Sequence, residues 1–126
     1  MSGEVFWLYE VGVRPGGGDA LRDLMAELVD SARAEPGTLT YQWTISDDDT
    51  VAHVYERYAD STSTLAHLAV FRETFAERFL AVVERRRLVL YGQPEDAINQ
   101  ALSGLGPVLM SPLTGFDRHD DSAANV

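Results

Sequence analysis

The chain has 126 residues, no cysteine and a formal net charge of -10, from 20 acidic and 10 basic residues. This length fits one domain of ordinary size, and without cysteine the chain cannot form disulfides, thiolate nucleophiles or cysteine-bound metal centres. Such an acidic surface disfavours nucleic acid and anionic membranes as partners. Every basic residue is arginine, which excludes lysine Schiff-base chemistry.

Two features of the N-terminal region bear on where the protein acts. Glu4 stands where a secretory signal would carry positive charge, and the apolar-rich run Val5–Val13 is too short to span a bilayer. We therefore expect a cytoplasmic protein with no membrane partner. We expect residues 1–118 to form a single domain and residues 119–126 to be a loose polar tail.

The first half of the chain predicts a strand, an amphipathic helix and a hairpin. Aromatic and branched residues favour a strand at Val5–Val13, which ends at the glycine-rich turn 15–18. Apolar residues at helical spacing then predict a helix that is capped by Asp19 and stops before Pro36. Two further strands, Leu39–Ile45 and Val51–Tyr58, flank the acidic turn 47–49.

The two strands of the hairpin have faces of different character if Ser46 lies opposite Thr50. One face is large and apolar, and it carries Leu39, Tyr41, Trp43, Ile45, Val51, His53, Tyr55 and Arg57. The other face is smaller and more polar, and it carries Thr40, Gln42, Thr44, Ala52, Val54, Glu56 and Tyr58. We expect the apolar face to contact a second copy of the chain and the polar face to line a cavity beneath the helices.

The second half predicts a helix, a strand, a short helix and a last strand. Asp60 or Ser61 caps a long helix whose apolar stripe includes Phe71, Phe75 and Phe79. The later segments are Leu88–Tyr91 as a strand, Pro94–Leu102 as a helix, and Val108–Phe116 as a strand. Pro112 places that last strand at an edge, or in contact with another subunit.

This order of elements is that of the α+β ferredoxin-like fold, a split βαβ with an antiparallel sheet, here with an added C-terminal helix and strand. Helices on one sheet face leave the other face open. A homodimer packed sheet on sheet, a dimeric α/β barrel, would cover it.

Glu56 and His67 are the main candidates for chemistry. Strand alternation turns Glu56 toward the helices, and helical phase turns His67 back toward the sheet. Such a pair can bind and deprotonate an acidic aromatic substrate. A structural hydrogen bond between a buried histidine and a carboxylate is an equal alternative. The polar face could also lie near a solvated edge instead of lining a cavity.

Other residues give weaker signals than this pair. His53, Glu56 and His67 could form a two-histidine, one-carboxylate iron site, but positions 53 and 56 point to opposite faces unless a bulge intervenes. An arginine near the pocket, Arg57 or Arg72, could assist, although strand alternation directs Arg57 elsewhere. His119 belongs to the polar tail, and no metal site is expected.

The chain resembles the antibiotic biosynthesis monooxygenase superfamily of small dimeric α/β-barrel proteins, which includes quinol monooxygenases and haem-degrading monooxygenases. The similarity extends over about residues 5–116. It is carried by Glu35-Pro36-Gly37, Thr40-Tyr41-Gln42-Trp43, the acidic turn, Val54-Tyr55-Glu56-Arg57-Tyr58, Asp60-Ser61-Thr62, and His67 followed by Phe71 and Phe75. In some members, tryptophan and asparagine stand at the positions of Tyr58 and Val54.

The resemblance implies a homodimeric enzyme that oxidises a phenolic, quinol or polycyclic aromatic substrate with molecular oxygen and without a cofactor. His67, held by Glu56, is then expected to remove the phenolic proton. The expected substrate-binding residues are Tyr58, Gln42, Thr40, Val54 and Phe71. Two alternatives remain open: a non-enzymatic ligand-binding or stress-associated dimer, and a haem-binding or haem-degrading relative.

Overall fold

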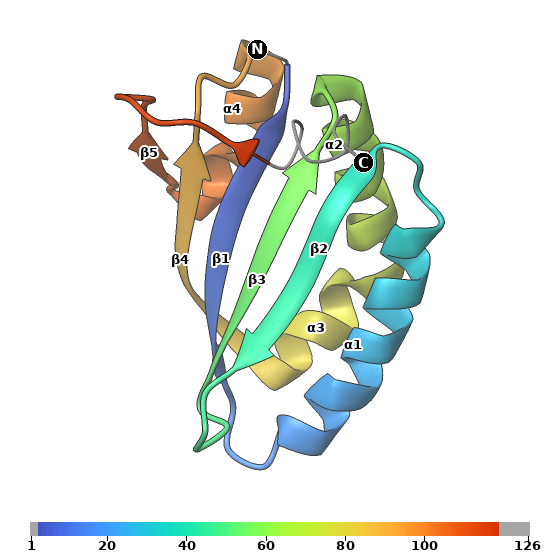
Figure 1. Cartoon of the computed structure of the whole chain (residues 1–126). Coiled ribbons are helices and arrows are strands. Elements are labelled where there is room, and N and C mark those ends of the chain that lie inside the picture. The colour runs from blue at the N-terminus through green and yellow to red at the C-terminus, as the bar shows by residue number, and fades with distance from the viewer. Residues whose placement is uncertain (1–2, 119–126) are drawn as a thin grey trace.

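A twisted sheet with helices on one face forms the framework of the computed structural model, which describes residues 3–118 (Figure 1). The strands are β1 (Val5–Val13), β2 (Thr38–Ile45), β3 (Val51–Tyr58), β4 (Val83–Tyr91) and β5 (Val108–Met110). The helical segments are α1 (Gly18–Arg33), α2 (Ser61–Val70), the π-helical turn η1 (Phe71–Phe75), α3 (Ala76–Val82), α4 (Asp96–Leu102) and the 3-10 turn η2 (Ser103–Leu105). Within the described residues, no helix is long and apolar enough to cross a bilayer.

The strand order within the described chain is β2-β3-β1-β4-β5, with antiparallel pairing except between β4 and β5. This arrangement confirms the α+β ferredoxin-like fold, with an added helix and strand after β4. The largest boundary differences from the prediction concern β4 and β5. β4 begins at Val83, because a strand can carry the exposed polar run 84–87, and β5 ends at Met110, so Pro112 lies outside it.

Helix ends follow the local sequence in one case and depart from it in another. Asp60 caps α2, as expected, by accepting a hydrogen bond from the Ser63 N–H at 2.7 Å. The predicted cap at Asp19 is wrong, because α1 begins two residues earlier, at Gly18, and Gly17 is its N-cap. An unpredicted π turn, η1, interrupts the long second helix, and the Ala76 N–H there donates to the Phe71 carbonyl.

The register of the β2–β3 hairpin is shifted by one residue from the prediction. Ser46 donates its N–H to the Val51 carbonyl at 2.8 Å, so it does not pair with Thr50. Farther along, Trp43 lies opposite Val54 and Tyr41 lies opposite Glu56. A shift of one residue exchanges the two faces of a strand. The predicted orientation of β2 is therefore wrong, whereas that of β3 is correct.

The turn itself explains this register. The Ser46 hydroxyl accepts hydrogen bonds from the backbone N–H groups of Thr50 and Val51, at 3.2 and 3.0 Å. The Asp48 carboxylate accepts from the Thr50 N–H and hydroxyl, and Asp49 adopts a left-handed conformation with φ of 62°. These contacts keep Thr50 within the loop, so the ladder starts one residue later than predicted.

Two apolar clusters fill the space between the sheet and its helices. One joins α1 and α3 to the lower part of the sheet through Val11, Leu21, Leu24, Leu28, Ala52, Phe75, Phe79 and Val83. The other joins α4 to the upper part through Val5, Trp7, Tyr58, Leu88, Leu90, Ile98 and Leu102. Tyr9 packs against both clusters. The site described below lies between them.

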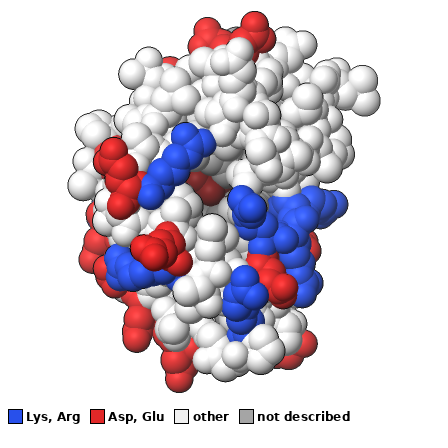
Figure 2. Space-filling model, turned by 180° about the vertical axis from the view of Figure 1, so that it is seen from behind, with Lys and Arg blue, Asp and Glu red and all other residues white. Residues whose placement is uncertain are grey.

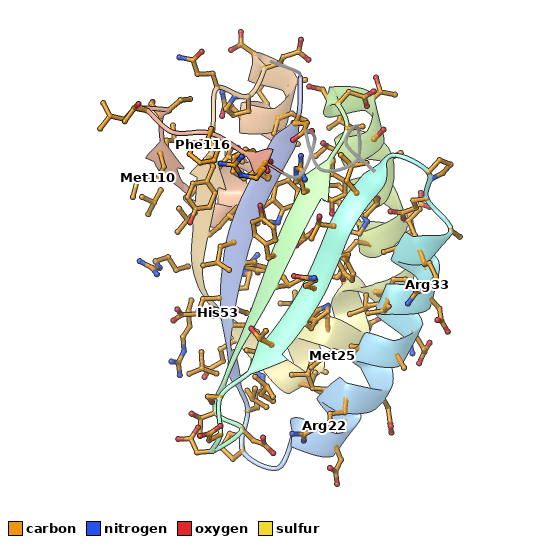
Figure 3. All side chains as sticks on the ribbon, in the orientation of Figure 1. Arg22, Met25, Arg33, His53, Met110 and Phe116 are labelled. Atoms are coloured by element: carbon orange, nitrogen blue, oxygen red, sulfur yellow. The ribbon has the colours of Figure 1, made fainter. Side chains whose placement is uncertain are left out.

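The opposite face of the sheet carries no helix in Figure 1. His53 lies on this face and contacts the Glu10 carboxylate at 3.0 Å (Figure 3). Arg57 also lies there, paired with Glu4 at 2.8 Å, so its predicted direction is correct. Met110 and Phe116 extend from the same end of the molecule and are largely exposed (Figure 3).

Candidate functional site

A cavity of about 290 Å³ lies between the sheet and the helices. Its lining residues are Trp7, Tyr9, Tyr41, Trp43, Val54, Glu56, His67, Leu68, Phe71, Arg72, Ala76, Phe79, Leu80, Arg85, Leu88, Ala101, Leu102, Gly104 and Leu105. Figure 2 views the helix-covered side, which is hollowed near its centre, with acidic atoms inside the hollow and basic side chains beside it. A mainly aromatic wall with a few polar groups is typical of a small-molecule site.

Glu56 is the acidic group of this wall. It projects from β3 toward the helices and is only 5% exposed. The Trp7 indole N–H donates to its Oε2 at 2.8 Å, and the Tyr58 hydroxyl donates to its Oε1. Burial raises the pKa of Glu56 above its ordinary value of 4.5, against the opposing effects of nearby His67 and the two donors. The site therefore favours the protonated carboxyl more than water does.

His67 connects Glu56 to a second carboxylate, Glu35. Its Nε2 lies 3.5 Å from Glu56 Oε1, and its Nδ1 lies 2.8 Å from Glu35 Oε1. Glu35 Oε1 also accepts a hydrogen bond from the Thr38 hydroxyl at 2.7 Å. The His67 side chain is 8% exposed, so the imidazole is held between two acidic groups and largely screened from water.

The shorter contact assigns the tautomer of neutral His67. Nδ1–H donates to Glu35, which leaves the Nε2 lone pair facing Glu56. A protonated Glu56 can share its proton with that lone pair, and an ionised Glu56 can accept one from an imidazolium. The Glu56–His67 pair is therefore an acid–base couple at the cavity wall, and Glu35 holds the imidazole from behind.

The tyrosines of the site remain protonated. Burial, together with the carboxylate of Glu56, raises the pKa of Tyr58 and of Tyr41 far above the usual phenol range. Burial also raises the pKa of Tyr9 to about 12, although the charge of Arg85 acts in the opposite direction. These hydroxyls can donate hydrogen bonds but do not supply phenolate bases near neutral pH.

The structure brings four of the predicted site residues to the cavity and leaves three outside it. Glu56, His67, Val54 and Phe71 line the cavity. Tyr58 is fully buried behind Glu56 and does not line it, so its predicted contact with a ligand is not seen. Thr40 and Gln42 pair with Arg57 and Tyr55 on the opposite sheet face, so their predicted place under the helices is wrong.

Several lining residues were missed by the sequence interpretation. Tyr41 and Trp43 occupy the positions expected for Thr40 and Gln42, and only the hydrogen bonds of the turn reveal this register. Trp7 could have been found, because it lies on the same face of β1 as buried Val5 and Val11. Glu35 follows the end of α1 and carries no sequence signal for its contact with His67.

The proposed iron site is not formed. His53 lies on the open sheet face with Glu10, whereas Glu56 and His67 face the helices. Among residues 3–118, no group of three histidine or acidic side chains is placed to hold a metal ion. His119 lies outside the described residues.

A family model matches most of this chain. The model described as antibiotic biosynthesis monooxygenase matches residues 5–85, a stretch that contains Glu35, Glu56 and His67. A comparison with curated proteins gave no match.

Solved structures share the same fold at low sequence identity. MupZ from Pseudomonas fluorescens superposes with a TM-score of 0.84 and 22% identity, over 95% of this chain and 93% of that chain. A putative antibiotic biosynthesis monooxygenase from Nitrosomonas europaea superposes with a TM-score of 0.65 and 20% identity, over 74% of this chain and 92% of that chain. SnoaB, a cofactor-independent oxygenase from Streptomyces nogalater, superposes with a TM-score of 0.60 and 15% identity, over 75% of this chain and 96% of that chain. At these identities, the likeness shows the fold alone.

Proposed function

The chain belongs to the antibiotic biosynthesis monooxygenase family, and from this premise we propose that it is a cofactor-independent monooxygenase that oxidises a phenolic, quinol or polycyclic aromatic substrate with molecular oxygen. The similarity of its fold to SnoaB, described as a cofactor-independent oxygenase, supports this reaction class. The single observation that carries the proposal is the contact of His67 with Glu56 and Glu35 at the wall of an aromatic cavity.

The first step of the proposed reaction is removal of the phenolic proton. A phenol has a pKa of about 10 in water, and its anion transfers an electron to oxygen more readily than the neutral phenol does. His67 Nε2 accepts the proton, and the resulting imidazolium stabilises the phenolate beside it. For oxidation at a ring CH₂ group, one oxygen atom forms the new carbonyl and the other leaves as water with the two hydrogens.

Aromatic side chains orient the substrate in this proposal. Tyr41, Trp43 and Phe71 surround the acid–base couple and offer ring faces for stacking. They take the role that the sequence assigned to Gln42 and Tyr58. Tyr58 instead acts on Glu56, because its hydroxyl donates to that carboxylate.

Glu35 is a positioning residue for His67. Its carboxylate faces Nδ1 at 2.8 Å and is itself held by Thr38, so it fixes both the ring orientation and the tautomer. Haem ligation by His67 would have to break one of its two carboxylate contacts. This geometry favours proton transfer over the haem-binding alternative.

Oxygen consumption with a panel of naphthohydroquinones and anthrones tests the proposal. We expect turnover by the wild type, a loss of about 10²–10⁴-fold in His67→Ala, and unchanged turnover in the control Asp23→Ala, which alters an exposed residue of α1. Full activity of His67→Ala would refute the assignment of the base. Binding of these compounds by the wild type without oxygen consumption would instead indicate a ligand-binding protein.

We also propose that the enzyme works as a homodimer through the open sheet face. Phe6 and Tyr91 stack there with ring centroids 5.4 Å apart, and Leu8 and Tyr55 lie opposite each other beside them. A half-exposed aromatic and aliphatic face of this kind is typical of an interface. Light scattering should give twice the chain mass for the wild type and for Ala26→Glu on exposed α1, but the monomer mass for Leu8→Glu. A monomeric wild type would refute the dimer.

A further inference from the structure

The arginines of this acidic chain are distributed unevenly. Four of them form ion pairs with acidic residues in the described part of the chain: Arg14 with Glu84, Arg22 with Asp49, Arg57 with Glu4 and Arg78 with Glu27. Arg72 and Arg85 line the cavity, and neither makes an ion pair within residues 3–118. Arg33, Arg86, Arg87 and Arg118 also make no ion pair among these residues, but of the arginines without an ion pair only Arg72 and Arg85 meet at the cavity.

The fold holds Arg72 at the cavity. It belongs to the π turn η1, and its Nη2 donates to the Ala101 carbonyl of α4 at 2.8 Å. This hydrogen bond connects η1 to α4, which lines the cavity through Ala101 and Leu102. The guanidinium has five N–H donors, so most of them remain available to a ligand.

A bulge directs Arg85 toward the same cavity. The β1–β4 pairing shifts between Glu10 and Val11, where Glu10 pairs with Arg87 but Val11 pairs with Arg85. The extra residue, Arg86, interrupts the alternation, and Arg85 shares the helix-covered face with Val11. The charge of Arg85 acts on the Tyr9 hydroxyl, which lies in the cavity wall.

We propose that Arg72 and Arg85 form an anion-binding subsite, so that the ligand is an aromatic molecule carrying a carboxylate or a similar anionic group. The ring lies among Tyr41, Trp43 and Phe71 near the acid–base couple, and the anionic group pairs with the guanidinium groups. An overall negative surface repels such a ligand, and the two cations offset that repulsion locally. This subsite deepens the proposed function, because it names the substrate class of the same cavity.

Calorimetric binding of a matched pair of probes tests the subsite without any turnover. The probes are 2-naphthoate and its uncharged methyl ester, which share the ring system and differ in charge. We expect the wild type to bind naphthoate at least tenfold more tightly than the ester. Arg85→Gln should weaken naphthoate binding by about tenfold and leave ester binding unchanged. Arg72→Gln, which also removes the hydrogen bond to the Ala101 carbonyl, should reduce the preference for naphthoate over the ester by about tenfold.

Two further variants separate charge from folding. Arg72→Lys keeps the positive charge and should retain most of the preference for naphthoate. Arg87→Gln removes an arginine from the same strand as Arg85 but on the opposite sheet face, and should bind both probes as the wild type does. Equal wild-type affinity for the two probes, binding of neither probe, or equal losses in Arg87→Gln and Arg85→Gln would overturn the subsite. A charge-dependent preference without oxygen turnover would keep the subsite and reject the monooxygenase.

Discussion

Glu56→Gln provides the most direct test of the electrostatics at the site. The amide keeps the shape of the side chain, and its oxygen can accept the Trp7 indole N–H that Glu56 Oε2 accepts at 2.8 Å. Its NH₂ group can donate to the Tyr58 oxygen or to His67 Nε2, so the side chain at position 56 keeps hydrogen-bond partners. The variant therefore mimics the protonated form of Glu56 without opening a cavity.

The expected effect is a pH-dependent difference in stability. The pKa of Glu56 is raised in the folded protein above the 4.5 of an ordinary glutamate, so the unfolded chain releases this proton at lower pH. The contribution of the protonated carboxyl is fully present below pH 4.5 and is lost as pH rises through the folded pKa. Between these values, the wild type should lose about 1.4 kcal/mol of unfolding free energy per pH unit relative to Glu56→Gln.

Urea unfolding followed by tryptophan fluorescence at several pH values between 4 and 8 measures this difference. The slope belongs to the coupled Glu56–His67 pair, because Nε2 lies 3.5 Å from the carboxylate. Glu27→Gln, which alters an exposed partner of Arg78, is the matched control and should track the wild type. The raised pKa of Glu56 would be refuted if the difference in unfolding free energy stayed constant with pH. It would also be refuted if the wild type became more stable relative to Glu56→Gln as pH rises.

Three further substitutions test the packing around the site. Asp60→Ala removes the cap of α2 and should lower the melting temperature at pH 7. Because the pKa of Asp60 is depressed below 3.8, the difference should shrink as pH falls through that depressed value, where the neutral carboxyl caps more weakly. Gly37→Ala would place a Cβ 1.9 Å from the Ser63 hydroxyl oxygen. Urea unfolding should show that the free energy of unfolding falls by about 1–3 kcal/mol and is partly restored by Ser63→Gly. An unchanged free energy of unfolding would contradict the close approach. Leu105→Trp fills part of the cavity, so naphthoate binding should fall at least tenfold while the melting temperature stays close to that of the wild type. Unchanged naphthoate binding would show that the ligand lies elsewhere.

Most of the fold follows from short-range patterns in the sequence. Val5–Val13 and Val51–Tyr58 are strands with the predicted bounds, because alternation of side chains and flanking turn residues act locally. The orientation of Glu56 and His67 toward each other follows from the same periodicities. Glu56 lies on the regular strand β3, and His67 lies on α2 before the π turn interrupts the helix. The contact of this pair could therefore be predicted from spacing alone.

The composition of the cavity wall could not be anticipated in the same way. It depends on whether Thr50 belongs to the turn or to the strand, and that choice is made by hydrogen bonds to the Ser46 hydroxyl and the Asp48 carboxylate. Secondary-structure propensities do not distinguish registers that differ by one residue. The register that forms nevertheless places Tyr41 and Trp43 in the cavity wall. Arg85 depends on the bulge between Glu10 and Val11, which has no clear sequence signature either.

The cavity wall comes from two parts of the chain, one inside and one outside the stretch that matches the family model. Glu35, Glu56 and His67 lie within the stretch 5–85 that matches the family model. Leu88, Ala101, Leu102, Gly104 and Leu105 also line the cavity but follow that stretch. Changes in α4 or η2 can therefore reshape the cavity without moving Glu56 or His67. Arg72 joins the two parts, because it lies in the family-matched stretch and binds the Ala101 carbonyl of α4. An uncharged residue at position 72 would thus affect both the anion subsite and the position of α4. Arg72→Lys separates these two effects, because it keeps the charge but changes the geometry of the hydrogen bond to Ala101.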